Sequence, residues 1–234
     1  MKTIGLIGGM SWESTVTYYR LINEAVKQRM GGFHSAKILL YSVDFHEIEE
    51  CQSRGEWDLA AAILADAAGR LETAGADFIV ICTNTMHKVV PQIEQTLRIP
   101  ILHIAEATAD ALKQQAIKKV LLLGTRYTMT QDFYKEKLVS AGIEVVIPDL
   151  QEIEDINHII FHELCLGRIE TASKERYRKI IESYTGSKIQ GVILGCTEIG
   201  LLIRPGDVSV PVFDTTEIHA MAAVNRCFGD GRSV

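Results

Sequence analysis

The sequence predicts an α/β fold made of two similar lobes, each with a mainly parallel sheet flanked by helices. Three observations lead to this prediction. Short strand-like runs alternate with amphipathic stretches along the whole chain, these runs are apolar almost throughout, and the two halves of the chain end their strands in a similar way. Continuous apolar character is typical of strands that are buried on both faces of a parallel sheet. Alternation of strands and helices predicts right-handed crossover connections between parallel neighbours.

The individual elements follow from local patterns. The expected strands are the Val-, Ile- and Leu-rich runs at 3–8, 36–42, 76–82, 100–104, 118–124, 144–148, 191–195 and 210–214. The expected helices repeat apolar residues at helical spacing, at 13–30, 56–75, 131–142 and 174–184. Several of these stretches end in glycine, which is common just after a helix. The charge-rich segment 170–179 is expected to be a solvated helix face.

The two halves also resemble each other. Gly8 and Gly124 each close a strand, and Thr83 and Cys196 each follow a later strand of the same half. The separations, 83 − 8 = 75 and 196 − 124 = 72 residues, are similar enough to indicate a duplicated topology. We therefore expect a first lobe of residues 1–98 and 210–234 and a second lobe of residues 99–209, with the active site in the cleft between them.

Composition excludes several classes of protein. The chain has 234 residues, 47% of them hydrophobic and 23% charged, as in an ordinary globular protein. A net charge of -6 argues against nucleic acid or an anionic membrane as the main partner. No apolar run approaches the roughly 20 residues that span a bilayer, and the N-terminus lacks the plan of a signal peptide.

Cysteine and histidine usage indicates a cytoplasmic protein without a metal or nucleotide cofactor. The five cysteines are widely separated and form no C-x-x-C pair, which favours reduced thiols over disulfides or a zinc site. The seven histidines do not cluster with acids or cysteines, and His87 and His219 are expected to be structural. Gly8 and Gly9 do not form the G-x-G-x-x-G fingerprint, so we expect no dinucleotide site. They would instead let the backbone approach a small carboxylate.

Two strand ends carry the candidate chemistry. When 80–82 is aligned with 193–195 by apolar character, Cys82 matches Gly195 and Thr83 matches Cys196. Ligands of open α/β sheets bind at the carboxyl ends of strands, so Thr83 and Cys196 are expected to point into one cleft from opposite sides. Cys82 is then the last residue of a buried strand and packs as a small hydrophobe.

A proton donor and acceptor on opposite sides of an α-carbon can invert an amino acid without a cofactor. A thiol suits this task, because its unperturbed pKa is about 8.5 and its surroundings can lower it. Amide and hydroxyl groups such as those of Asn84, Thr85 and Thr197 can donate hydrogen bonds to a carboxylate on which charge develops.

The chain resembles the cofactor-independent aspartate/glutamate racemase family over essentially its whole length, most of all the bacterial L-aspartate/glutamate-specific or broad-specificity members. The matching pieces are IGLIGGMSWEST at 4–15, VDFHEIEECQSRGEWD at 43–58, CTNTMH at 82–87, LLGTRYTM at 122–129, GCTEIG at 195–200 and FDTTEIHA at 213–220. The resemblance implies two pseudo-symmetric lobes, a homodimer, no cofactor, and a catalytic pair of cysteines, one in each lobe.

Site residues follow from the resemblance by position. Cys196 is the acid/base of the second lobe, and Thr83 stands where the first cysteine is expected. The implied substrate-binding residues are Met10, Gln52, Thr83, Asn84, Thr85, Thr125, Thr128 and Thr197. Glu198 replaces the histidine of related glutamate racemases and is expected to orient Cys196 or relay its protons. Cys165 takes the place of a lysine that relatives often carry, which leaves Arg54 and Arg126 as candidates to hold a side-chain carboxylate.

Threonine at position 83 is the main departure from the family. A hydroxyl is a far weaker acid than a thiol, so Thr83 would donate or relay a proton while Cys196 abstracts one. We expect a catalyst that favours one enantiomer, slower or inactive in the reverse direction.

Blander interpretations remain open for both residues. Thr83 would then only bond backbone in a turn, and Cys196 would be inert. Two other functions also fit: a single-cysteine decarboxylase or isomerase of small dicarboxylates from the same superfamily, and a binding protein that holds a dicarboxylate without turnover.

Overall fold

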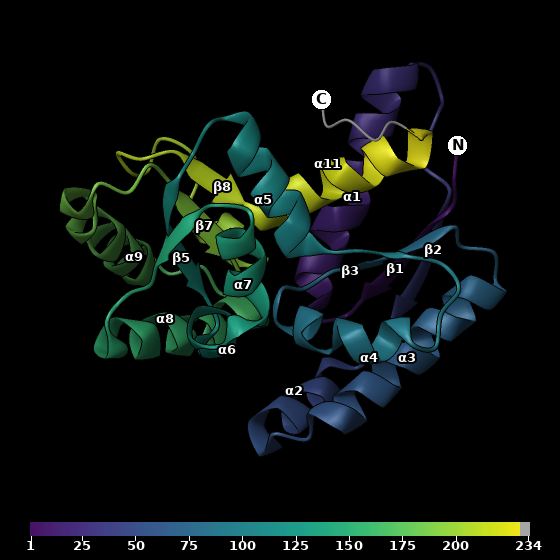
Figure 1. The fold of residues 1–234 in the computed structure, drawn as a ribbon, viewed down its shortest axis with the longest axis horizontal. Helices are drawn as coiled ribbons and strands as arrows, with labels where there is room; N and C mark the ends of the chain where they lie inside the picture. Colours follow the sequence, from purple (N-terminus) through teal and green to yellow (C-terminus); the bar gives the residue numbers. More distant parts are fainter. Residues whose placement is uncertain (230–234) are drawn as a thin grey trace. The chain divides into compact units, whose positions relative to one another are not determined.

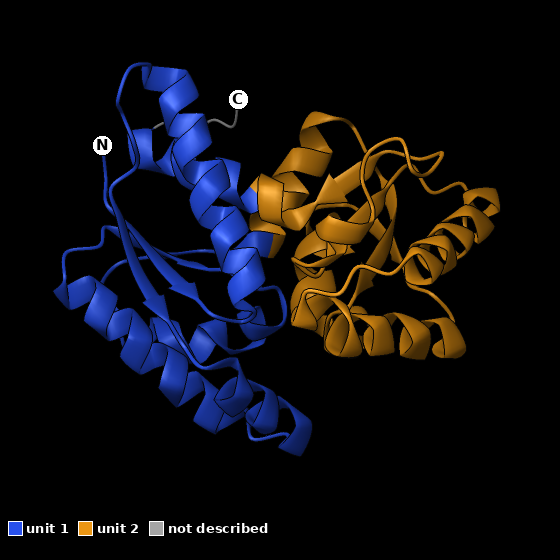
Figure 2. Cartoon of the chain, turned by 180° about the vertical axis from the view of Figure 1, so that it is seen from behind, with its two compact units in different colours: residues 1–104, 219–234 blue, residues 105–218 orange. Residues whose placement is uncertain are grey.

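The computed structural model describes residues 1–229, which form two compact units (Figures 1 and 2). The first unit consists of residues 1–104 and the segment from His219 onward, and the second of residues 105–218. Each unit has its own four-stranded sheet, in which every pairing is parallel. The predicted α/β fold with two lobes is confirmed.

The sheet of the first unit has the strand order β2-β1-β3-β4. Its strands are β1 (Ile4–Gly8), β2 (Ile38–Ser42), β3 (Phe78–Ile81) and β4 (Ile101–Leu102). Its helices are α1 (Trp12–Met30), α2 (Phe45–Arg54), α3 (Trp57–Thr73), the 3-10 turn η1 (Thr85–Val89), α4 (Val90–Glu94) and most of α11 (Thr215–Phe228).

Helices cover both faces of this sheet, as Figure 1 shows. Leu6 of β1 belongs to a hydrophobic cluster with residues of α1 and α11, such as Tyr18 and Ala223. The next residue, Ile7, belongs to a second cluster with residues of α2, α3 and α4, such as Leu64. Successive side chains of a strand point to opposite faces, so the apolar run of β1 is explained by burial on both.

The second unit repeats this plan with the strand order β6-β5-β7-β8. Its strands are β5 (Lys119–Gly124), β6 (Glu144–Val146), β7 (Val192–Gly195) and β8 (Val212–Asp214). Its helices are α5 (Ile104–Gln114), α6 (Arg126–Thr130), α7 (Asp132–Ser140), α8 (Leu150–His162), η2 (Leu164–Leu166), α9 (Thr171–Ser183), η3 (Thr185–Ser187) and α10 (Ile199–Leu202).

Each of the strands predicted from apolar runs corresponds to one strand of β1–β8. The two sheets have equivalent orders, since in each the first strand lies between the second and the third. The predicted duplication of topology therefore agrees with the sheet connections. Helices α2 and α5 were not among the predicted helices.

The compact units differ from the predicted lobes at both boundaries. β4 pairs with β3, so the chain leaves the first unit after Ile104 rather than near residue 98. β8 pairs with β7, so the segment at 210–218 stays in the second unit and the return begins at His219. Both differences have one cause. The unit to which a short edge strand belongs depends on the strand with which it forms hydrogen bonds, and the sequence pattern does not show which strand that is.

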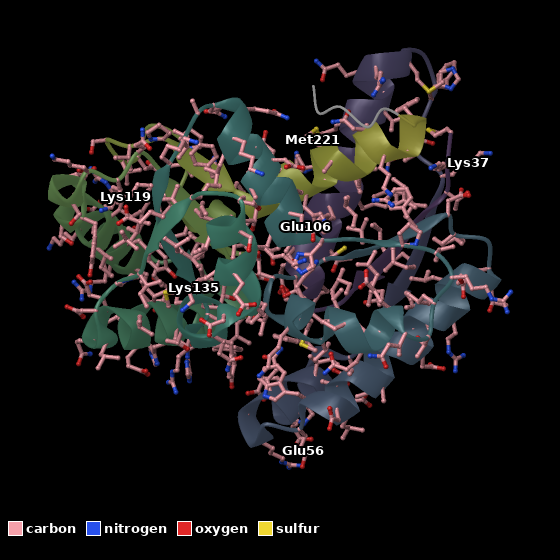
Figure 3. All side chains as sticks on the ribbon, in the orientation of Figure 1. Lys37, Glu56, Glu106, Lys119, Lys135 and Met221 are labelled. Carbon is pink, nitrogen blue, oxygen red and sulfur yellow. The ribbon has the colours of Figure 1, made fainter. Side chains whose placement is uncertain are left out.

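The segment 170–179 is a second correction, because it is not wholly a solvated face. Tyr177 of α9 is fully buried, and Ser173 on the same face is 6% exposed. Charged side chains elsewhere do project from the surface, as Lys37 and Glu56 do in Figure 3. Among the helices of residues 1–229, none is both long and apolar enough to cross a membrane.

A buried polar pair joins α1 to α11. The Nε2 atom of His219 lies 2.8 Å from the Leu102 carbonyl oxygen, so this nitrogen carries the proton. Nδ1 then accepts the hydrogen bond from the Tyr18 hydroxyl at 2.9 Å. Burial, with the neighbouring His87 as a second cause, lowers the pKa of His219 to about 3.

Gly124→Ala should destabilise the second unit, because the added Cβ would lie 2.7 Å from the Gly195 carbonyl oxygen, a backbone atom. We expect a loss of about 1–3 kcal/mol in the free energy of unfolding, measured by urea denaturation. Gly69→Ala in α3 is the matched control. No atom lies within 4 Å of its added Cβ, so this change should stabilise the helix by up to about 1 kcal/mol. Equal effects of the two substitutions would contradict the close approach of β5 and β7.

His219→Gln should flatten the dependence of stability on pH. The pKa of His219 is lowered on folding, so its unfolded form binds a proton below about pH 6.5 while the folded form does not. Stability is therefore present above that pH and is lost as the pH falls. The free energy of unfolding should fall by about 2 kcal/mol less in the variant than in the wild type between pH 7.5 and 5, measured by urea denaturation. His46→Gln, at an exposed histidine, is the control, and parallel curves for wild type and His219→Gln would refute the assignment.

Candidate active site

The loop after β3 holds the predicted site residues of the first unit. We define it as the Thr83 loop, residues 82–85. Cys82 is fully buried and donates its backbone N–H to the Ile7 carbonyl at 2.9 Å, so it packs as predicted but lies one residue after the end of β3. Thr83 is partly exposed, whereas Asn84 and Thr85 are 2% and 4% exposed. Thr83 is thus the only residue of this loop with more than marginal access to solvent.

The strand register supports the alignment of Thr83 with Cys196. In the first sheet Ile7 pairs with Ile81, which puts Gly8 beside Cys82 one residue later. In the second sheet Gly124 pairs with Gly195. If the two closing glycines, Gly8 and Gly124, correspond, the residues that follow these pairs correspond as well. Those residues are Thr83 and Cys196.

Gln52 and Met10 lie against the same loop region. The Gln52 side-chain amide donates to the sulfur of Met86, in η1, at 3.1 Å. Met10 is 2% exposed and shares a hydrophobic cluster with Met86. The structure therefore brings both predicted residues close to the segment that follows the Thr83 loop.

The turn between β1 and α1 needs its glycines for packing. A Cβ on Gly8 would lie 2.3 Å from Cγ2 of Thr15. Gly9 has φ +93° and donates its N–H to the Thr15 hydroxyl at 2.8 Å, and a Cβ there would lie 2.2 Å from the Val43 carbonyl oxygen. The predicted role in approaching a carboxylate is therefore not required to explain these glycines.

In the second unit, two adjacent turns hold the predicted residues. Thr125 caps α6, because its hydroxyl accepts the backbone N–H of Thr128, and the two hydroxyls lie 3.2 Å apart. The next turn follows β7 and is defined here as the Cys196 turn, residues 195–198. A Cβ on Gly195 would lie 3.3 Å from Cγ2 of Thr128, so the two turns are side by side.

Glu198 is the centre of the Cys196 turn. Its Oε2 accepts hydrogen bonds from the Cys196 thiol at 3.0 Å and from the Thr197 hydroxyl at 2.9 Å. Glu198 is 2% exposed and Cys196 is 7% exposed. The sequence prediction that Glu198 supports Cys196 thus has a direct hydrogen bond behind it.

The surroundings of Cys196 hold the thiol in its protonated form. Burial is the largest cause that raises the pKa of Cys196 well above its usual value, and the charge of Glu198 is the second. A buried thiolate next to a carboxylate would place two negative charges in a region of low dielectric constant. Ionising the thiol is therefore favourable only if the proton passes to a nearby acceptor, and Glu198 is in hydrogen-bond contact.

Sequence reasoning missed one neighbour of Cys196. The pKa of the buried Tyr177 hydroxyl is raised well above its usual value, first by burial and then by Cys196 and Cys165. Cys165 itself is partly exposed and packs against the hydrophobic cluster that contains Cys196. The signal available in the sequence was the helical spacing of Tyr177 with Ile180 and Ile181, which predicts a buried face.

The candidate arginines are already engaged within their own units. Arg54 pairs with Glu50 at 2.9 Å, one helical turn away, and Arg126 pairs with Glu154. Both guanidinium side chains are at least half exposed, so these ion pairs are weak and a substrate carboxylate can compete for either cation.

A surface cleft of about 550 Å³ in the first unit contains none of the predicted site residues. Its lining includes Asp44, Glu47 and Asp66, and this negative charge disfavours an acidic substrate.

Comparison with known proteins decides the family. The model of the Asp/Glu/hydantoin racemase family matches residues 7–223. The chain belongs to this family. The family resemblance predicted from six sequence motifs is confirmed.

Solved structures and a curated relative of the family resemble the chain along its length. A Yersinia pestis protein, provisionally named Asp/Glu racemase, is 57% identical with a TM-score of 0.90, over 97% of this chain and 100% of its own. An aspartate racemase homologue from Pyrococcus horikoshii is 41% identical with a TM-score of 0.84, over 97% and 100%. The broad specificity amino-acid racemase of Bacillus subtilis is 24% identical over 95% of this chain and 96% of its own.

Glu198→Gln should make the Cys196 thiol easier to ionise. The change removes the negative charge that helps to raise the pKa of Cys196, so this pKa should fall. The measurement is the pH dependence of alkylation by iodoacetamide, read by mass spectrometry of the peptide that contains Cys196. Glu136→Gln, at an exposed carboxylate of α7, serves as the control. An unshifted alkylation profile in Glu198→Gln would contradict the assigned interaction.

Proposed function

We propose that this chain is a cofactor-independent amino-acid racemase (an isomerase) that acts on aspartate or glutamate. In this proposal Cys196 removes the proton from Cα on one face, and Thr83 supplies a proton to the other face. The names of the relatives support the reaction class, and the thiol–carboxylate pair of Cys196 and Glu198 is the observation that carries the mechanism.

The pair provides a base without burying a second charge. Transfer of the thiol proton from Cys196 to Glu198 gives a thiolate next to a neutral carboxylic acid. The total charge of the Cys196 turn stays at one negative, so the desolvation cost of the thiolate is limited. The thiolate can then take the Cα proton. Glu198 therefore acts as the proton acceptor that activates Cys196.

Thr83 has the complementary task. Its hydroxyl stays protonated at neutral pH, so it is suited to donate a proton to the carbanion-like state rather than to abstract one. As it donates, the Thr83 oxygen must take a proton from water or another group, and in the reverse direction it passes that proton back, so both directions cross the same relay step.

Any bias toward one enantiomer is limited by thermodynamics. The two enantiomers have equal free energy in water, so the ratio kcat/KM must be the same in both directions. A slower direction must therefore have a lower kcat and a correspondingly lower KM. We propose a bias of this kind, and the expectation of a reverse reaction that is absent is withdrawn on these grounds.

The substrate carboxylates would be held by hydroxyl and amide donors. In the first unit these are Asn84, Thr85 and Gln52, with Met10 as an apolar contact. In the second unit they are Thr125, Thr128 and Thr197. These hydroxyl and amide groups are buried, where a hydrogen bond to developing negative charge is stronger than in water.

Two finer predictions accompany the function. A homodimer is expected, since twofold assemblies are common and the family resemblance implies one. A cytoplasmic location is expected from the use of cysteine, and none of the five cysteines, all within residues 1–229, forms a disulfide.

Thr83→Ala should separate proton exchange from inversion. Without the hydroxyl, Cys196 can still remove and return the proton on its own face. In deuterated water, one enantiomer of glutamate or aspartate should exchange its Cα–H at a rate within about tenfold of the wild type. Inversion should fall by about 10²–10⁴, the usual contribution of a positioned acid. Proton NMR follows the exchange, and polarimetry or chiral chromatography follows the inversion.

Cys196→Ser is the paired variant and should lose both exchange and inversion, while Thr83→Ser should keep both. If Thr83→Ala inverts glutamate and aspartate as fast as the wild type, Thr83 is not the second acid. If the wild type exchanges no Cα–H but releases carbon dioxide from a malonate, the single-cysteine decarboxylase is the correct function. Tight binding without exchange or release would indicate a binding protein.

A further inference from the structure

A buried cluster of histidines lies directly behind the Thr83 loop in the first unit. We define the histidine cluster as Tyr18, His87, His103 and His219. The ring centroid of His87 lies 4.7 Å from that of His103 and 5.7 Å from that of His219. The ring of Tyr18 meets that of His219 edge-on, with 5.7 Å between their centroids. The three imidazoles are at most 8% exposed. The proposed reaction uses none of them.

The proton positions on His87 follow from its partners. The backbone N–H of Ile104 donates to Nε2 at 3.1 Å, so this nitrogen must be unprotonated. Nδ1 then carries the hydrogen and donates it to the Thr83 carbonyl oxygen at 2.8 Å. His87 is therefore a neutral imidazole with both nitrogens satisfied. Burial is the main cause that lowers its pKa well below the usual range, which keeps it in this form.

The two hydrogen bonds of His87 join it to a candidate catalytic residue and to the boundary between the units. Thr83 is the candidate acid, and Ile104 is the last residue of the first unit before the chain enters the second. His219 is the residue at which the chain returns, and it holds the Leu102 carbonyl just before Ile104. Both passages of the chain between the units are thus fixed to the histidine cluster, and His87 fixes the Thr83 carbonyl to the same cluster.

The return passage begins beside the Cys196 turn. In the first turn of α11, the Thr215 hydroxyl donates to the Leu194 carbonyl at 2.8 Å, and the Thr216 hydroxyl lies 3.4 Å from the Thr197 carbonyl. His219 follows Thr216 by one helical turn.

We propose that His87 is a positioning residue of the racemase reaction, which sets the orientation of Thr83 through its carbonyl and couples it to Ile104. This role rests on the proposed function. A hydroxyl that delivers a proton to Cα needs its donor atom held within a few tenths of an ångström of the productive position. Thr83 sits in a short loop and is partly exposed, so it needs an external support. The imidazole of His87 supplies that support from a buried, rigid site.

Two substitutions at His87 each remove one of its two hydrogen bonds and keep the other. In His87→Asn, the side-chain amide reaches the position of Nδ1 and can still donate to the Thr83 carbonyl, but it loses the acceptor for Ile104. In His87→Gln, the longer side chain reaches the position of Nε2 and can still accept from Ile104, but it loses the donor to Thr83. His46→Gln, at an exposed histidine, is the matched control.

The expected result is selective. His87→Gln should lower the kcat of inversion by about 10–100-fold with KM changed less than about twofold, because the support of Thr83 is lost. Exchange of Cα–H on the Cys196 face should stay within about threefold of the wild type. His87→Asn should invert within about fivefold of the wild type. Equal losses of exchange and inversion in both variants would overturn the proposal, because a purely structural role affects both reactions alike.

The activity of the wild type distinguishes a failure of the positioning role from a failure of the proposed function. If the wild type exchanges no Cα–H of glutamate or aspartate, the proposed function fails, and the positioning role fails with it. If the wild type is active and both variants lose exchange and inversion equally, only the positioning role fails.

An NMR measurement on the wild type tests the proposal even if the variants do not fold. The proton on Nδ1 of His87 should give a resolved ¹⁵N-coupled resonance in histidine-labelled wild type, and saturating glutamate or aspartate should shift it. The resonances of His46 should stay unchanged. A His87 resonance that reports protonated Nε2, or that does not respond to saturating substrate, would overturn the proposal.

Discussion

The hydrogen-bonded pairing of the first strand with the third in each unit is the constraint on which the rest of the structure depends. In the second unit this pairing brings Gly124 and Gly195 so close that neither can carry a side chain. In the first unit the pairing of β1 and β3 ends at Ile81, two residues before Thr83. Because parallel strands end at the same edge of a sheet, the register places a polar turn next to a glycine turn in both units. Thr83 and Cys196 owe their positions to this edge.

The sequence predicted the parts of this arrangement that depend on local pattern. The apolar runs of β1, β3, β5 and β7 predicted buried strands, and alignment of their ends predicted the correspondence of Thr83 with Cys196. The sequence prediction was wrong where the boundary of a unit depends on which strands pair in the folded chain. The short strands β4 and β8 have too few residues to reveal their partner, so both unit boundaries were misplaced. Tyr177 was hidden because a charged sequence surrounds it on α9, although the spacing of its apolar neighbours was available.

Hydrogen-bond satisfaction explains why the polar residues at these turns are the types observed. A buried carboxylate is tolerable when donors surround it, and Cys196 and Thr197 provide two to the same oxygen of Glu198. A histidine at position 198 would offer its own proton and could accept only one of these bonds through a single nitrogen. In the proposed reaction, Glu198 stands where the family resemblance leads us to expect a histidine, and it makes this turn a site that takes protons from Cys196 rather than one that gives them. This change suits a unit whose thiol has to act as a base.

The opposite change is found on the Thr83 side, where a hydroxyl stands in place of a thiol. Thr83 cannot hold negative charge at neutral pH, and the buried His87, which donates to the Thr83 carbonyl, is held neutral by its two partners. The first unit is thus built from groups that keep their protons, and the second from a pair that can exchange one. A racemase must still obey equal free energies of its two substrates, so the asymmetry cannot change the equilibrium. It can only decide which enantiomer binds more tightly and turns over more slowly. In the proposed reaction, Thr83 and Glu198 are best understood together, since each assigns one step of the proton transfer to one unit.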